Sequence, residues 1–197
     1  MRIIHLLFLL LTAGVSPPTA IEMQKYEIQL FGDKIGEMTI TRETKPDGTE
    51  FYVVESASKA KILWINRDNY SHYEFTFKAG KLIATSYKEM EGGKISRWGQ
   101  MKKEGNVYVV SNYAGKKVFT EVPEFSIPSI YFGQVKNMKR IYYDAEAEFV
   151  NVEHPDANTI EFKTSDGHRN VYHFENGQLH HMEFHVSIAT AKMIRVK

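Results

Sequence analysis

Apolar and polar residues alternate along most of the chain, in segments as long as typical β-strands. Tyr26, Ile28 and Leu30 alternate with charged and polar residues, and residues 73–77 repeat the pattern with three aromatic side chains. A period of two places the apolar side chains of a strand on one face of a sheet and the polar ones on the other. We therefore predict strands that each have one buried and one solvated face.

Glycine-containing dipeptides separate these segments at intervals of about ten residues, which is the spacing of an antiparallel meander. Such dipeptides supply the positive φ angles that tight hairpin turns require. They are Asp47-Gly48, Ala79-Gly80, Gly92-Gly93, Gly105-Asn106, Ala114-Gly115, Asp166-Gly167 and Asn176-Gly177. The pattern predicts an all-β fold, an antiparallel meander of about 12–14 strands curled into an open barrel or a strongly bent sheet.

One short helical turn is predicted near residues 127–133, where Pro128 is suited to the first turn of a helix and Gly133 to its end. This turn separates a first meander, at about 22–122, from a second, at about 139–197. Because no Gly/Ser tract or proline run lies between the two, we predict a single all-β domain over residues 21–197.

The first twenty residues have the pattern of a secretory signal peptide. A basic start, Met1-Arg2, precedes an apolar run from Ile3 to Leu11, and small and turn-forming residues follow as far as Ala20. The run is shorter than the roughly 20 residues that span a bilayer. We therefore expect residues 1–20 to be removed, the mature chain to have no transmembrane anchor, and the protein to be periplasmic or extracellular in a bacterial envelope.

The composition of the chain argues against several classes of function. The chain is 43% hydrophobic and 25% charged, which is typical of a globular protein, and its formal net charge is +1. A near-neutral chain gives no support to nucleic-acid binding. It contains no cysteine, which excludes disulfide scaffolds, cysteine-ligated metals and thiol nucleophiles. Metalloprotease, serine-hydrolase and phosphate-loop motifs are missing from the sequence, so we predict neither an enzyme nor a cofactor.

Three short motifs carry a family resemblance. Gly32 is followed by Ile35-Gly36-Glu37, the centre of the chain reads Ile130-Tyr131-Phe132, and a late hairpin begins Asp166-Gly167 and turns at Asn176-Gly177. In this order they resemble a family of secreted bacterial proteins known only as a domain of unknown function. The chain also loosely resembles the open β-barrels of envelope lipid carriers. The motifs contain turn and core residues, so the resemblance implies an architecture and a compartment.

The late hairpin is rich in histidine. Its five histidines are His168, His173, His180, His181 and His185. A two-residue Asn176-Gly177 turn would place His173 opposite His180 and His168 opposite His185. One hypothesis is a Zn²⁺ or Cu²⁺ site formed by His168 and His185, with His181 or Glu183 as the third ligand. The alternative is a solvated strand face that happens to contain histidine.

A second candidate site is a pocket on the inner face of the sheet. A Gly92-Gly93 turn would pair Ser86 with Gly99 and Ala84 with Met101, which would line that face with small side chains. Small inward residues either allow close packing or leave room for a ligand. Arg97 would meet an acyl carboxylate or a phosphate head group. The predicted pocket comprises Phe75, Phe77, Ala84, Ser86, Arg97, Gly99, Val110 and Phe119.

These features support three functional hypotheses. We predict a non-catalytic envelope protein that binds a hydrophobic small molecule or a lipid inside the curled sheet. The alternative is a structural or interaction module that contacts an envelope protein through its outer face or an edge strand. Metal binding at the histidine hairpin is the third. An apolar interior void of several hundred Å³ would favour the first hypothesis, and a filled core would favour the second.

Overall fold

The computed structural model describes residues 19–62, 65–186 and 189–196, so most of the predicted leader lies outside the described residues. The described chain forms strands and one short helix, α1 (Ile127–Tyr131). The strands are β1 (Ala20–Leu30), β2 (Asp33–Thr44), β3 (Glu50–Ile62), β4 (Ile65–Lys78), β5 (Lys81–Glu91), β6 (Lys94–Glu104), β7 (Val107–Asn112), β8 (Gly115–Phe119), β9 (Arg140–Tyr143), β10 (Glu148–Asp156), β11 (Thr159–Lys163), β12 (Arg169–Glu175), β13 (Gln178–Val186) and β14 (Ala189–Val196). The predicted all-β class is therefore confirmed.

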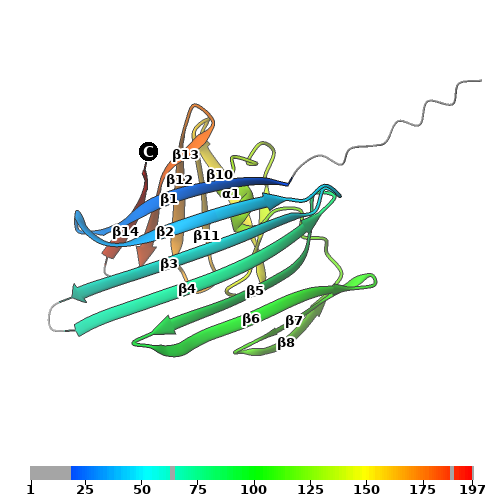
Figure 1. Cartoon of the computed structure of the whole chain (residues 1–197), viewed down its shortest axis with the longest axis horizontal. Coiled ribbons are helices and arrows are strands. Elements are labelled where there is room, and N and C mark those ends of the chain that lie inside the picture. Colours follow the sequence, from blue (N-terminus) through cyan, green and yellow to red (C-terminus); the bar gives the residue numbers. More distant parts are fainter. Residues whose placement is uncertain (1–18, 63–64, 187–188, 197) are drawn as a thin grey trace, which may run out of the picture.

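All of these strands belong to one antiparallel sheet. Its order is β8-β7-β6-β5-β4-β3-β2-β1-β14-β13-β12-β11-β10-β9. In the part of the chain that the structure describes, each strand therefore pairs with its neighbours in the chain, except that β8 does not pair with β9, and the first strand also pairs with the last. Figure 1 shows β1 beside β14, where the two meanders join. The edges of the sheet are β8 and β9, and the curl does not close into a barrel.

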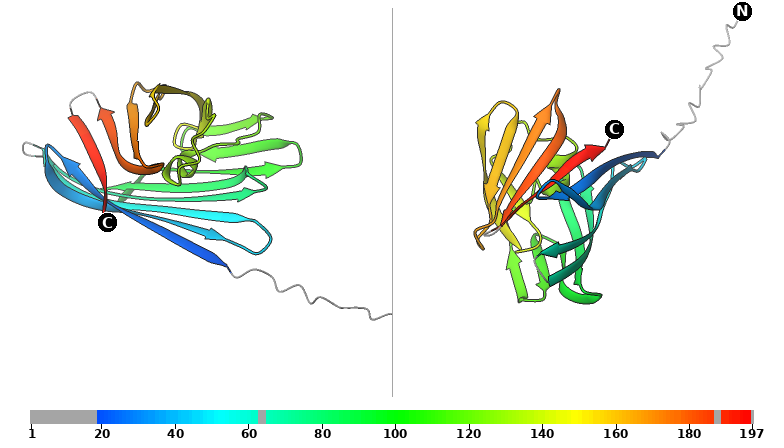
Figure 2. Two further views of the ribbon diagram at one scale, coloured as in Figure 1. Left: turned by 90° about the horizontal axis from the view of Figure 1, so that it is seen from above. Right: turned by 90° about the vertical axis from the view of Figure 1, so that its left-hand side faces the viewer.

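The segment between the two edge strands lies inside the curl. Figure 2 shows this segment, which carries α1, surrounded by the strands. It connects both halves of the sheet, because the Leu82 N–H donates to the Pro123 carbonyl at 3.0 Å and the Tyr142 N–H donates to the Phe125 carbonyl at 2.9 Å. Pro128 lies in the first turn of α1, and Gly133, with φ of 71°, follows its end. The predicted helical turn is confirmed.

The core is a single cluster that lines the concave face of the sheet. Five tyrosine side chains from both halves are almost completely buried there: Tyr26, Tyr52, Tyr108, Tyr142 and Tyr172. Ile130 of α1 is fully buried among them. Burying this much aromatic surface is the main favourable contribution to folding, and α1 supplies the apolar surface that the strands alone would leave uncovered.

Within the described residues, no helix is long and apolar enough to cross a membrane.

Two predicted hairpin registers are wrong beyond the first pairs after the turn. At Gly92-Gly93, Met90 lies opposite Ile95 as predicted, but a bulge at Ser96 then moves the pairing by one residue, and Gly99 lies opposite Tyr87. A bulge inserts one unpaired residue, so every later side chain meets a different partner. Ala84 and Ser86, predicted to face inward, lie on the outer face of β5, because the buried side chains of Thr85 and Tyr87 occupy its inner face.

The histidine hairpin contains the same kind of irregularity. Phe174 lies opposite Leu179, in the register that the two-residue turn predicts. A bulge at His180 follows, so His173 faces His181 and His185 faces Arg169. The predicted pairs His173–His180 and His168–His185 are therefore wrong, because the extra residue in β13 shifts the register of the rest of the strand.

Candidate functional site

A cavity of about 190 Å³ lies between α1 and the concave face of the sheet. Strands from both meanders, the helix, and the turn between β9 and β10 contribute to its wall. The lining residues are Met38, Val54, Ser56, Ser71, Tyr73, Phe75, Ile127, Tyr131, Tyr143, Asp144, Ala145, Tyr172, Phe184 and Met193. Its surface is mainly aromatic rings, aliphatic side chains and methionine, which is the composition of a site for an apolar ligand.

Small side chains create the space on the β3–β4 side of the cavity. The inner face of β3 changes from Val54, which is buried, to Ser56 and then Ser58, which are half-buried. Ser56 lies opposite Ser71 of β4, and their hydroxyl oxygens are 2.7 Å apart. One hydroxyl donates to the other, which leaves one O–H group of the pair able to donate elsewhere.

Asp144 is the buried acidic residue in the wall of the cavity. Its side chain is 4% exposed, and Ser126, just before α1, donates its hydroxyl to Oδ2 at 2.9 Å. Among the described residues, Oδ1 has no hydrogen-bond partner. Burial raises the pKa of Asp144 to about 7, although the hydroxyls of Thr85 and Ser126 act in the opposite direction. The wall of the cavity therefore includes a buried carboxyl group with one oxygen that lacks a partner among the described residues.

The turn that carries Asp144 is held against β5 and β6. The Arg97 guanidinium donates to the Ala145 carbonyl at 2.7 Å, and the Tyr87 hydroxyl donates to the same oxygen at 3.1 Å. Arg97 also forms ion pairs with Glu146 and, at 3.6 Å, with Glu89. The structure thus gives the guanidinium three partners within the protein. We predicted that Arg97 meets the head group of a ligand. In the structure it instead holds the cavity wall in position.

The predicted pocket overlaps the observed cavity at one residue, Phe75. Phe77 and Val110 are buried elsewhere in the core, with Phe119 packed against it. The space above Gly99 is filled, since a Cβ atom there would lie 2.9 Å from Cζ of Tyr87. Sequence reasoning missed the wall formed by β2, β3, β12, β13 and β14. The alternating small residues of β3, residues 56, 58 and 60, are a signal that could have indicated it.

Of the predicted metal ligands, the structure brings His181 and Glu183 together on the outer face of β13 and adds His173 to them. His168 lies in the turn before β12, where its Nδ1 is 3.2 Å from Oδ2 of Asp166. His185 is on β13, with its Nε2 3.3 Å from Oε2 of Glu183. The four predicted ligands therefore do not form one cluster.

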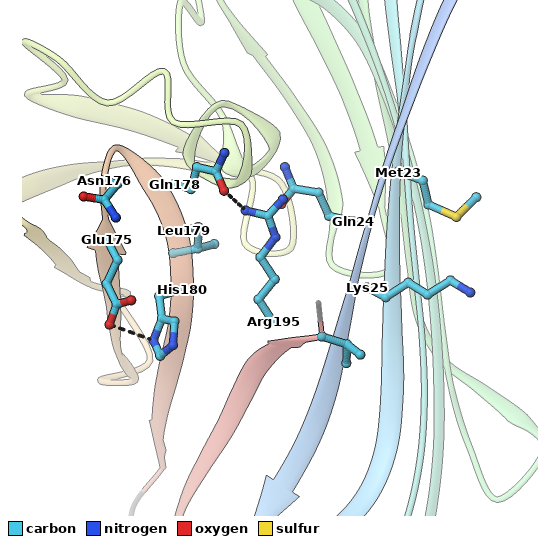
Figure 3. A pocket seen from close by; sticks show the side chains of 10 residues that line it. Met23, Gln24, Lys25, Glu175, Asn176, Gln178, Leu179, His180 and Arg195 are labelled. Carbon is cyan, nitrogen blue, oxygen red and sulfur yellow. Dashed lines mark hydrogen bonds and ion pairs between the residues drawn. The ribbon is translucent and has the colours of Figure 1, made fainter.

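A second hollow is an open cleft of about 830 Å³ between β1 and the β12–β13 hairpin. Figure 3 shows Arg195 of β14 reaching across it toward Gln178, with its guanidinium 2.8 Å from the amide oxygen. The cleft forms because β1 pairs with β2 from Ala20 onward but with β14 only from Lys25. Met23, 58% exposed, lies at its rim.

An incompletely closed, single-sheet barrel around a short helix defines an all-β, barrel-like class of protein. Residues 26–196 match the family model of a domain of unknown function, DUF6134, and the chain belongs to that family. This confirms the resemblance to an uncharacterised all-β family.

A solved structure with the same fold is described as a beta-barrel-like protein of domain of unknown function DUF1849 from Brucella abortus. The two chains are 14% identical, with a TM-score of 0.59, and the match covers 89% of this chain and 95% of that one. At this identity the likeness concerns the fold alone. A search of curated proteins finds no match.

Proposed function

We propose that this protein is a non-catalytic, exported protein that binds one small hydrophobic ligand in the cavity between α1 and the sheet. The observation that carries the proposal is the combination of an apolar wall with a buried carboxyl oxygen that lacks a hydrogen-bond partner among the described residues. Such sites bind a ligand by apolar burial and orient it with one or a few polar groups. The leader pattern of residues 1–20 supports export.

The cavity volume limits the size of the ligand. At about 190 Å³ it falls short of the several hundred Å³ that would favour a lipid-binding interior, which is also the volume of a typical drug-sized site. Apolar cavities of about 150 Å³ bind a single aromatic ring. The ligand is therefore one ring or one short alkyl chain, rather than a lipid with two complete acyl chains inside the curl.

Asp144 limits the chemistry of the polar end of the ligand. An anionic head group beside a buried carboxyl would be repelled whenever Asp144 is ionised. A hydroxyl or an amide can donate to the Oδ1 oxygen without adding a charge. The ligand class that fits is therefore an apolar molecule with one neutral hydrogen-bond donor, such as a short-chain alcohol.

Filling the cavity should weaken the binding of octanol. Ser56→Leu places a larger side chain on the inner face of β3, against Ser71, and should weaken the binding of octanol by about tenfold or more, since it removes the volume in which the chain lies. Isothermal titration of octanol into the wild type and the variant measures this effect. Ala57→Leu adds a larger side chain on the exposed outer face of the same strand and serves as the control. Equal affinity for all three proteins would contradict the proposal.

The open edge of β1 favours a second candidate function, the docking of an envelope protein. Within residues 19–62, 65–186 and 189–196, the pairing with β14 ends at Lys25, so residues 20–24 of β1 extend beyond it, and Ile21 and Met23 are exposed there. An extended peptide can add to such an edge as a further strand. A partner bound there would change the NMR methyl signal of Met23 and leave those of Met38 and Met193 unchanged.

A further inference from the structure

We propose a second site, for a divalent transition-metal ion, on the outer face of β12 and β13, formed by His173, His181 and Glu183. One ligand atom of each residue lies within 4.8 Å of the other two, and all three side chains are half-buried. The site is independent of the cavity, because alternation along β12 and β13 places Tyr172 and Met182 on the opposite, concave face.

The bulge at His180 assembles this site. Without it, His173 would face His180, and His181 would point to the other side of the strand. With it, His181 lies opposite His173, and the two imidazole rings stack with their centroids 4.3 Å apart. His180 remains adjacent, with its Nδ1 3.0 Å from Nδ1 of His181. Bulges often redirect a side chain at a functional position, and here the redirected side chain is His181.

The Glu183 carboxylate supplies the negative charge of the cluster. Glu183 is two residues from His181, so both side chains lie on the same face of β13. The Lys192 ammonium is 2.8 Å from Oε1 of Glu183 and lowers the pKa of that carboxyl. The Glu183 carboxylate and an unprotonated imidazole nitrogen of each histidine can all donate an electron pair to a metal ion.

The donor set indicates which ions fit. Two imidazole nitrogens and one carboxylate oxygen suit zinc or copper, and a water molecule can complete the coordination. Calcium and magnesium prefer sites composed of oxygen ligands. Lys192 and His185 lie beside the two oxygens of the Glu183 carboxylate, which would have to leave them in part. We therefore expect a site weaker than one in which every ligand is free.

Calorimetric titration of zinc chloride into the full chain tests the proposal, and the histidines of the same hairpin supply the controls. The wild type should bind one zinc ion and should not bind calcium. His173→Ala and His181→Ala should each weaken zinc binding by at least about tenfold, because even the loss of a group that only orients a ligand has an effect of that size. His168→Ala removes a histidine outside the cluster and should bind zinc as the wild type does.

Two results would overturn the proposal. One is a wild type that binds no zinc, and the other is unchanged zinc affinity in the His173→Ala and His181→Ala variants. Thermal unfolding without metal shows whether a variant is folded. Glu183→Gln keeps the size of the side chain but removes its charge, and it should also weaken zinc binding. Octanol binding should be the same in these variants as in the wild type, so failure of this proposal and failure of the cavity proposal are distinguishable.

Discussion

Replacing Gly36 with valine should destabilise the protein by about 3 kcal/mol, at the upper end of what overpacking a core costs. Gly36 lies next to the bulge in β2 and opposite Ser58 of β3. A Cβ atom on Gly36 would lie 2.6 Å from the Cα atom of Ser58 and would also overlap the carbonyl oxygen of Ala57. Because both are backbone atoms, the strands must separate to accommodate any side chain.

Urea unfolding measures this effect, and Ala57→Val is the matched control. Ala57 lies on the neighbouring strand with its side chain exposed, so the control adds two methyl groups without the overlap and should change the stability by less than about 0.5 kcal/mol. A Gly36→Val variant as stable as the control would mean that β2 and β3 do not approach each other as described. Gly36 belongs to the motif in which Gly32 is followed by Ile35-Gly36-Glu37. This motif therefore marks a position where the backbones of β2 and β3 lie close together.

Asp144→Asn should remove a large, pH-dependent loss of stability. The pKa of Asp144 is about 7 in the folded protein and about 3.9 in an unfolded chain. Between these values the folded state holds a proton that the unfolded state has released, so stability falls as the pH rises, by up to about 1.4 kcal/mol per pH unit. Below about pH 4 this group contributes no such loss, and above about pH 7 the loss is complete.

The difference in unfolding free energy between Asp144→Asn and the wild type should therefore increase from about pH 4 to about pH 7 and then remain constant. Urea unfolding at several pH values measures it. Asp33→Asn removes the same charge at an exposed position and should not reproduce this gain. Parallel curves for the wild type and Asp144→Asn would show that the Asp144 carboxyl is not buried.

The strands were predictable because their signals are local. Turn dipeptides such as Asn176-Gly177 have the backbone preference that their hairpins need. The alternation in residues 73–77 identifies the buried face without reference to other strands. The helical turn followed from Pro128 and Gly133 in the same way. These features together account for the class and for several of the hairpins, whereas the turns at Phe31-Gly32 and Ala157-Asn158 are not among the predicted dipeptides.

The candidate sites were less predictable because they depend on bulges and on long-range contacts. Neither Ser96 nor His180 has a residue type that marks a bulge, yet each one decides which side chains share a face. The cavity depends on the packing of α1 against strands from both meanders. The pKa of Asp144 is raised only because that packing buries its carboxyl group. A single local pattern does not contain this information.

NMR of methionine methyl groups during an octanol titration tests the central claim most directly, because methionines mark each region of the molecule. Met38 and Met193 line the cavity, Met101 is buried in the core away from it, and Met23 lies at the rim of the open cleft. A ligand in the cavity predicts saturable shifts of the Met38 and Met193 signals, with those of Met101 and Met23 unchanged. Shifts confined to Met23, or none at all, would contradict the cavity as the binding site.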